Sequence, residues 1–154
     1  MSDKILISAC LLGQPVRYDG KSKPIADVIW LQQLQQQNRL IVVCPEMAGG
    51  LQTPRPPAEK VGDQVITITG KNVTKEFNVG AEHALQLCKT NNIQYALLKA
   101  KSPSCGNKKI YNGEFSEQLT EGQGVTAKRL CEHGIQVFSE LEIEQLKKII
   151  QRTY

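Results

Sequence analysis

The 154-residue sequence lacks several features that would assign it to a broad class at once. No apolar run approaches the ~18 residues that a membrane-spanning helix requires. Residues 1–4 lead directly into a short strand-like run, and not into the charged segment and long apolar core of a secretion signal. Internal repeats are absent, and the only low-complexity tract is the glutamine-rich segment 32–37. We therefore expect a cytoplasmic protein, without membrane attachment, that forms a single domain over residues 1–154.

Composition and charge exclude further classes without selecting a partner. Hydrophobic residues make up 40% and charged residues 22% of the chain, which is typical of a globular protein and excludes disorder and coiled coils. The 19 Lys and Arg against 15 Asp and Glu give a net charge of +4. This excess tolerates anionic partners but is too small to indicate nucleic-acid binding by itself.

Cysteine usage is the most informative feature. The chain has five cysteines, an odd number that argues against a disulfide framework in a cytoplasmic protein. No two of them form a C-x-x-C pair, so the short-range zinc and ferredoxin patterns are missing as well. The thiols are therefore expected to be reduced, and to be buried, reactive or metal-bound.

Apolar runs and helical periodicities alternate along the chain. Buried strands are predicted at Lys4–Ser8, Leu40–Val43, Tyr95–Lys99 and Ile135–Phe138, and a half-exposed antiparallel or edge strand at Gln64–Thr69. Helices are predicted from Pro24 to about Asn38, from a cap at Thr74 to Thr90, over Val125–His133 with Gly134 at its end, and after a capping box of Ser139 and Glu142.

This order predicts an α/β fold in three layers, with a mostly parallel, Rossmann-like sheet and helices on both faces. The segment Ile110–Phe115 carries Asn112-Gly113 between strand-forming residues, the strongest short hairpin signal. We therefore expect a small β-hairpin appended to the sheet, turning at these two residues.

Three cysteines occupy equivalent places in the predicted fold. Cys10, Cys44 and Cys105 each follow a predicted strand, and the carboxyl ends of parallel strands are where ligands bind in open α/β sheets. They should therefore converge. Burial as small hydrophobic side chains explains them about as well at this point. Cys88 and Cys131 lie within predicted helices and are interpreted as packing residues, while His83 and His133 are interpreted as surface or capping residues.

Three ordered motifs carry a resemblance to a known family. They are Ser8-Ala9-Cys10-Leu11-Leu12-Gly13 with Tyr18-Asp19-Gly20, Cys44-Pro45-Glu46 with Gly49-Gly50-Leu51 and Pro54-Arg55, and Ser102-Pro103-Ser104-Cys105-Gly106. Together they resemble the thiouracil desulfidase family over nearly the whole chain. The resemblance implies non-redox removal of sulfur from a thiolated pyrimidine such as 2-thiouracil, giving uracil and sulfide. It also implies a [4Fe-4S] cluster held by Cys10, Cys44 and Cys105, with one iron left open.

The same resemblance implies catalytic roles for Glu46 and Ser102, and each residue also has a simpler interpretation. Glu46 could be a loop carboxylate paired with Arg55, and Ser102 a turn residue before Pro103. Asp19 could hold the substrate or form an Asp-Gly turn. Lys101 is a candidate substrate-binding residue, although Ala100-Lys101 departs from the family's commoner acidic-then-basic pair.

Loop cations widen the range of substrates that the sequence allows. They are expected to flank the site and could meet a phosphate or a cluster's negative charge; they are Arg17, Arg55, Lys99, Lys101, Lys108 and Lys109. The favoured partner is a free thiolated nucleobase. Thiolated nucleotides or transfer-RNA thiouridine are a second possibility, without an RNA-binding module to support them, and a non-enzymatic zinc- or thiol-binding module is a third.

Overall fold

The computed structural model describes residues 4–12, 18–20 and 28–151. Its centre is a parallel sheet whose four strands stand in the order β2-β1-β5-β8. The strands are β1 (Ile5–Ser8), β2 (Leu40–Val43), β5 (Tyr95–Leu98) and β8 (Gln136–Ser139). The predicted parallel α/β sheet is confirmed, because the four apolar runs are the four strands.

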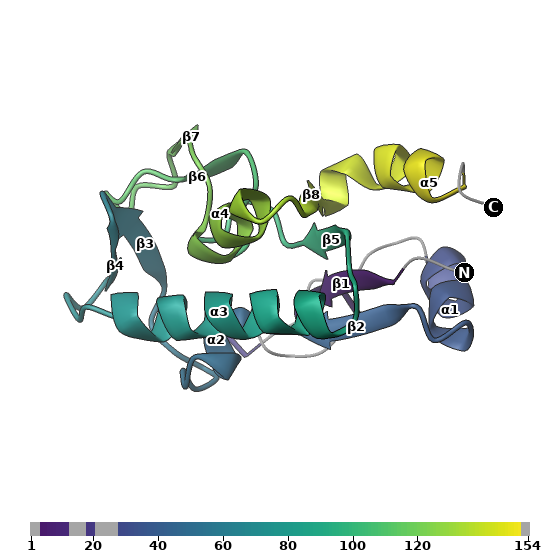
Figure 1. Cartoon of the computed structure of the whole chain (residues 1–154). Coiled ribbons are helices and arrows are strands. Elements are labelled where there is room, and N and C mark those ends of the chain that lie inside the picture. The colour runs from purple at the N-terminus through teal and green to yellow at the C-terminus, as the bar shows by residue number, and fades with distance from the viewer. Residues whose placement is uncertain (1–3, 13–17, 21–27, 152–154) are drawn as a thin grey trace.

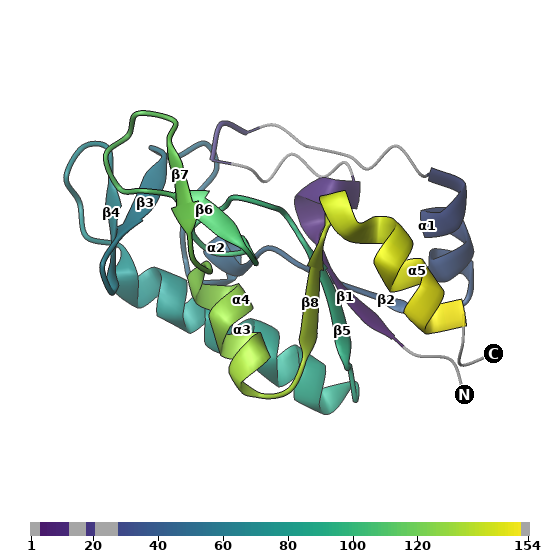
Figure 2. The same cartoon turned by 90° about the horizontal axis from the view of Figure 1, so that it is seen from above.

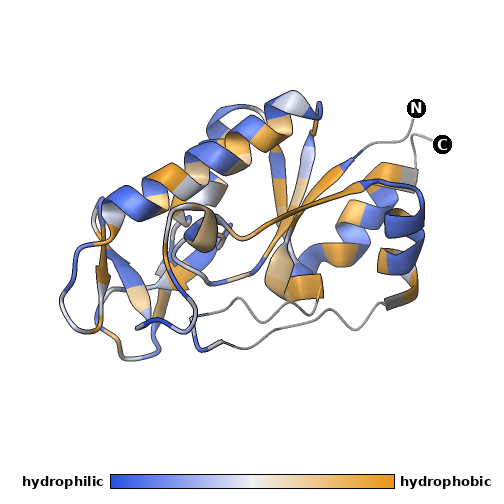
Figure 3. Ribbon diagram, turned by 90° about the horizontal axis from the view of Figure 1, so that it is seen from below, coloured by the Kyte–Doolittle hydropathy of each residue, from blue (hydrophilic) through white to orange (hydrophobic). Residues whose placement is uncertain are grey.

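Helices cover both faces of this sheet (Figure 2). Alternate side chains of β1 point to opposite faces: Ile5 and Ile7 pack with α1 (Val28–Gln36) and α5 (Ile143–Gln151), whereas Leu6 packs with α3 (Thr74–Thr90) and α4 (Val125–Glu132). The apolar stripes of the helices face the sheet in Figure 3. Two hydrophobic cores therefore fix the sheet between its helical layers.

The order of the strands places a switch point between β1 and β5. The chain leaves β1 through the short 3-10 helix η1 (Ala9–Leu12) and reaches β2 on one side, then returns through α2 (Pro45–Ala48) and α3 to β5 on the other side. Loops that follow β1 and β5 diverge at such a point, which opens a crevice at the carboxyl edge of the sheet.

Two antiparallel hairpins lie beyond that edge, at the end of the molecule opposite α1 and α5 (Figure 1). The first pairs β3 (Ala58–Val61) with β4 (Gln64–Thr67), which confirms the predicted antiparallel strand at 64–69. The second pairs β6 (Lys109–Tyr111) with β7 (Leu119–Glu121). The predicted turn at Asn112-Gly113 is wrong: the Asn112 N–H donates to the Gln118 carbonyl at 3.0 Å, so residues 112–118 form a wide loop.

Helix and strand ends differ from expectation where tertiary contacts decide them. Thr74 does not cap its own helix; Val73 holds that position, and the Thr74 Oγ1 accepts a hydrogen bond from the Val65 N–H of β4 instead. Strand β2 is one of the two edges of the sheet, with Val42 39% exposed, and is not a fully buried strand. Pro24, the predicted helix start, lies outside the described residues.

Other boundary signals are confirmed. Gly134 follows α4 with a φ of +80°, the left-handed conformation that glycine adopts without steric cost. The capping box of Ser139 and Glu142 is formed ahead of η2 (Glu140–Glu142) and α5. Within the described part of the chain, every helix is too short or too polar to cross a bilayer.

Candidate functional site

A cavity of about 770 Å³ lies at the carboxyl edge of the parallel sheet. Its walls come from the ends of β1 and β2, from α2, from the loop after β5 and from both hairpins. Cys10, Cys44 and Cys105 all line it. The three cysteines therefore meet at one cavity as expected, because each lies in the segment that follows a strand: Cys10 in η1 after β1, Cys44 directly after β2, and Cys105 in the loop after β5.

The three thiols differ in exposure. Cys10 in η1 and Cys105 after β5 are buried, whereas Cys44, the extended residue before α2, is partly exposed. Burial raises the pKa of the Cys105 thiol to about 12, and burial also raises the pKa of Cys44. Both thiols are therefore protonated at neutral pH unless a cation stabilises their thiolates.

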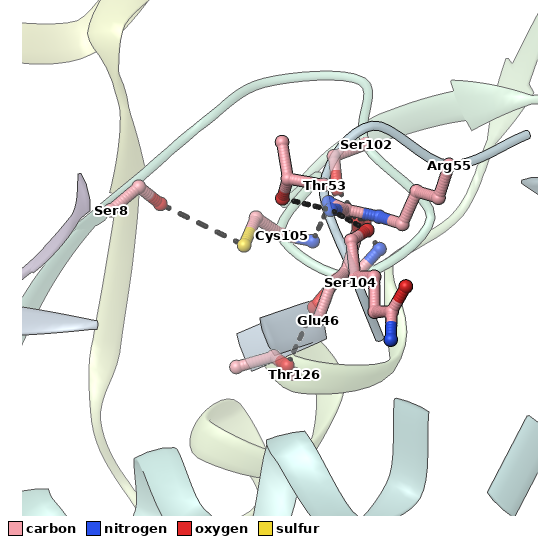
Figure 4. A network of polar contacts seen from close by, with 9 residues as sticks. Ser8, Glu46, Thr53, Arg55, Ser102, Ser104, Cys105 and Thr126 are labelled. Carbon is pink, nitrogen blue, oxygen red and sulfur yellow. Dashed lines mark hydrogen bonds and ion pairs between the residues drawn. The ribbon is translucent and has the colours of Figure 1, made fainter. Parts of the chain in front are cut away.

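The loop around Cys105 is held by its own serines (Figure 4). The Ser102 Oγ accepts hydrogen bonds from the backbone N–H groups of Ser104 and Cys105, both at 3.0 Å. The Ser104 hydroxyl in turn bonds the Thr126 hydroxyl at 2.8 Å. The turn interpretation of Ser102 is thus correct as local structure, and the same residue lines the cavity.

Strand β1 contributes a second contact to the same sulfur. The Ser8 hydroxyl donates to the Cys105 Sγ at 3.7 Å and accepts from the Lys99 N–H at 3.0 Å. These bonds join the carboxyl ends of β1 and β5, the two strands that flank the switch point. The position of Cys105 is therefore fixed both from its own loop and from the neighbouring strand.

Glu46 and Arg55 form an ion pair in the cavity wall. The Arg55 Nε donates to Glu46 Oε2 at 2.9 Å, and Arg55 Nη2 donates to the same oxygen. Both side chains are largely buried, at 15% and 9% exposed. Arg55 Nη1 also bonds the Gln52 carbonyl and the Thr53 hydroxyl. The pairing expected under the simpler interpretation of Glu46 is present, and both residues line the same cavity as the cysteines.

The other predicted binding residues are not all brought together. Lys101 lines the cavity and has a φ of +69°. Lys99 lines it too but is paired with Glu140 at 2.9 Å. Asp19 is not among the described lining residues, although its neighbour Tyr18 is. Arg17 lies outside the described residues.

The remaining loop cations lie away from the cavity wall. Lys108 is exposed and bonds Glu142 at 2.7 Å, and Lys109 is an exposed residue of β6. Neither is among the described lining residues.

The cysteines and histidines outside the cavity differ in their burial, and one of them differs from expectation. Cys88 packs in the core between the sheet and α3, as predicted. Cys131 is exposed, so its interpretation as a packing residue is wrong; it lies on the outer side of α4. His83 is exposed, and the His133 Nδ1 bonds the Arg129 carbonyl at the end of α4.

Sequence reasoning missed the part of the cavity wall that the two hairpins contribute. Glu59 of β3, Tyr111 of β6 and Phe115 in the following loop all line the cavity. Glu59 is buried, at 8% exposed, in a segment whose letters Ala-Glu-Lys-Val show no apolar run. The sequence signal that could have identified two of these residues is the position of Tyr111 and Phe115 on either side of the predicted turn at Asn112-Gly113.

The chain is similar to a known protein family and to known proteins. A model of the 2-thiouracil desulfurase family matches residues 5–142. A Bacillus subtilis (strain 168) protein, named as uncharacterized protein YbbK, is 36% identical over 152 residues, covering 92% of this chain and 99% of its own. A solved structure, the [4Fe-4S]-dependent thiouracil desulfidase TudS, is 53% identical with a TM-score of 0.95, covering 97% of this chain and 99% of its own.

The matched region contains the strands, the three cavity cysteines and the Glu46–Arg55 pair. The chain therefore belongs to the 2-thiouracil desulfurase family.

Proposed function

We propose that this chain is a cytoplasmic [4Fe-4S]-dependent desulfidase that removes sulfur from a thiolated pyrimidine such as 2-thiouracil, releasing uracil and sulfide. The observation that carries the proposal is the presence of three cysteines, from three separate strand ends, on the wall of one cavity. Family membership and the similarity to a desulfidase of this kind support it.

The donor set fits an iron–sulfur cluster. We assign Cys10, Cys44 and Cys105 as its ligands, because thiolates are the ligands that such clusters prefer. Among the described residues, no three His, Cys, Asp or Glu side chains are grouped closely enough for a single metal ion. The three cysteines that line the cavity would hold the cluster through their thiolates.

Three cysteine ligands would leave one iron of the cluster open, and that iron would supply a Lewis acid suited to a soft thiocarbonyl sulfur. The chain's own residues would perform the remaining steps. Glu46 would accept a proton from the attacking water or move a ring proton, and Arg55 would hold its carboxylate in place through Oε2.

Ser102 and Lys101 would act on the substrate. The Ser102 Oγ already accepts two backbone hydrogen bonds, so its own hydrogen is available to donate to the oxygen or nitrogen of the pyrimidine. The Lys101 ammonium at the cavity wall would attract electron-rich substrate atoms and developing negative charge. Asp19 is also proposed to bind substrate, because its neighbour Tyr18 lines the cavity.

Anaerobic purification with cluster reconstitution tests the proposal. We expect about four irons per chain, a brown colour and sulfide release from 2-thiouracil. Each of Cys10→Ala, Cys44→Ala and Cys105→Ala should lose the colour and the activity. Cys88→Ala and Cys131→Ala are matched controls, because neither cysteine lines the cavity, and both should keep their iron.

Two results would overturn the proposal. One zinc and no iron after strictly anaerobic handling would indicate a thiolate zinc site instead. A full complement of iron with no turnover of 2-thiouracil, but turnover of a thiolated nucleotide or transfer RNA, would move the substrate to that class.

A further inference from the structure

We propose that Phe115 is the surface on which the pyrimidine ring stacks, and that Glu59 is a positioning residue that holds Phe115 in the cavity wall. The inference rests on the proposed function and names the residues that recognise the substrate's ring. It is carried by contacts between the two hairpins.

Glu59 is a buried acidic residue whose carboxylate is engaged by backbone. One oxygen, Oε1, accepts hydrogen bonds from the N–H groups of Gly113 at 2.9 Å and Phe115 at 3.2 Å. Glu59 belongs to β3, whereas both donors belong to the loop between β6 and β7. A buried carboxylate requires such donors, so this contact joins the two hairpins firmly.

The loop approaches β3 closely at the same point. Gly113 has a φ of +92°, and a Cβ built there would lie 2.7 Å from the Lys60 carbonyl oxygen. Only glycine allows this approach. The chain then places Phe115 at a φ of +55°, a conformation that a bulky residue rarely adopts. The hydrogen bond from its N–H to Glu59 stabilises that conformation, which tends to occur where function requires it.

The result is an aromatic residue on the wall of the cavity that also contains the cysteines and Glu46. Phe115 is half-buried and lines this cavity together with Tyr111. A pyrimidine has a flat π-face and few apolar edges, so an aromatic ring is the protein group that binds its face best.

Four single variants and one double variant test the inference. The single variants are Phe115→Ala, Glu59→Ala, Glu59→Gln and, as a control in the same hairpin, the exposed Leu119→Ala. The double variant combines Phe115→Ala with Glu59→Ala. Each is measured for KM and kcat with 2-thiouracil, for uracil binding by calorimetry, and for iron content. Phe115→Ala should raise KM and the Kd of uracil ~10–100-fold. Its kcat and iron content should change far less, and Leu119→Ala should match the wild type.

Glu59 should act only through Phe115. Glu59→Ala should raise the same two constants, whereas Glu59→Gln should largely restore them because the amide oxygen accepts both N–H bonds. Adding Glu59→Ala to Phe115→Ala should have little further effect, since two residues that act as a unit are not additive. If Glu59 had a purely structural role, Glu59→Ala would raise KM and the Kd of uracil further in the double variant.

The outcomes separate this inference from the proposed function. Wild-type turnover with unchanged KM and uracil Kd in Phe115→Ala overturns the stacking role alone. Unchanged constants in Glu59→Ala, or full additivity of the double variant, overturn the positioning role. A wild type that neither turns over 2-thiouracil nor binds uracil overturns the proposed function and the inference together.

Discussion

The sequence left two interpretations of Glu46 open, a catalytic carboxylate and a loop carboxylate paired with Arg55, and the two are compatible. Its ion pair with Arg55 is formed, and two of the three guanidinium nitrogens, Nε and Nη2, bond the same oxygen, Oε2. We assign the proton transfer to Oε1.

Replacing Glu46 with Gln should lower kcat for 2-thiouracil by ~10²–10⁴-fold, the usual contribution of a general acid–base group. The amide keeps the shape and can still accept a hydrogen bond from Arg55, so iron content and folding should be retained. Steady-state kinetics on anaerobic protein measure the effect.

Glu82→Gln provides the matched control for Glu46→Gln. Glu82 also pairs with an arginine, Arg129, at 2.9 Å, but on the exposed surfaces of α3 and α4. It should leave kcat unchanged. A loss of kcat below about threefold in Glu46→Gln would exclude the assigned role.

Single residues were predictable where chain topology decides their position. Cys10, Cys44 and Cys105 could be grouped because the place of each after a strand is visible in the sequence. Glu59 could not be found in the same way. Its burial depends on a hairpin loop more than fifty residues later in the chain, and no local pattern reports such a contact.

Among the elements, α2 and α3 cross at unusually close range. A Cβ at Gly80 would lie 1.8 Å from the Pro45 carbonyl oxygen, and a Cβ at Gly49 would lie 1.9 Å from the Glu76 carbonyl oxygen. Backbone atoms are in the way in both cases, so neither contact can be relieved by rotating a side chain. This crossing sets the position of α2, and with it that of Cys44 and Glu46.

Gly80→Ala should therefore both destabilise the protein and disturb the cavity. We expect a loss of about 1–3 kcal/mol in the free energy of unfolding, the usual cost of overpacking. Iron content should fall as Cys44 shifts. Chemical denaturation and iron analysis are the measurements. Val79→Ala, at an exposed neighbouring position of α3, should change stability by less than about 0.5 kcal/mol; equal losses in both variants would contradict the argument.

The capping box before α5 makes stability depend on pH. Burial alone would raise the pKa of Glu142, but hydrogen bonds from Lys108, Asn107 and the Ser139 N–H outweigh it, so the pKa lies below its ordinary value. A carboxyl with a lowered folded-state pKa stabilises the protein fully above its unfolded pKa of about 4.3. That contribution is lost as the pH falls through the folded-state value.

Glu142→Gln should consequently be less stable than the wild type at pH 7, and the difference should shrink as the pH falls below about 4.3. Denaturant titrations of both proteins between pH 7 and pH 3 measure it. A difference that stays constant or grows on acidification would show that the charge of Glu142 contributes nothing.

Element boundaries were predicted well where local chemistry decides them and poorly where pairing does. Gly134 and the Ser139–Glu142 box were identified because such signals act within a few residues. The β6–β7 loop was predicted too short, since the hydrogen bonds that widen it come from Glu59 and Gln118. Strand β3 was missed because its two central residues, Glu59 and Lys60, are both charged, so the segment shows neither an apolar run nor an alternation.

On the scale of the whole molecule, the layered α/β architecture follows from four short apolar runs and the helices between them. The sequence could not show which strand would be the edge, and β2 proved to be one. It also could not show that two hairpins close one end of the molecule. Both facts depend on long-range packing.

Removal of the proposed cluster should lower the stability of the entire fold. A group that binds only the folded chain adds about 2.7 kcal/mol when present at a hundredfold excess over its Kd. For a chain of this size, that corresponds to a fall in Tm of roughly 5–10 °C on cluster loss. Anaerobic thermal unfolding before and after exposure to oxygen measures it. Cys10→Ala should show no such fall, and an equal fall in that variant would point to oxidative damage elsewhere.

The cavity is assembled from segments as distant in sequence as Ser8 and Glu117. During synthesis on the ribosome, the chain therefore offers no enclosed chamber until roughly its last quarter remains to be made. Until the β6–β7 hairpin has been synthesised, the thiols of Cys10 and Cys44 are accessible to oxidants and to free metal ions. Rapid folding after synthesis therefore protects the cysteine thiols in addition to completing the cavity.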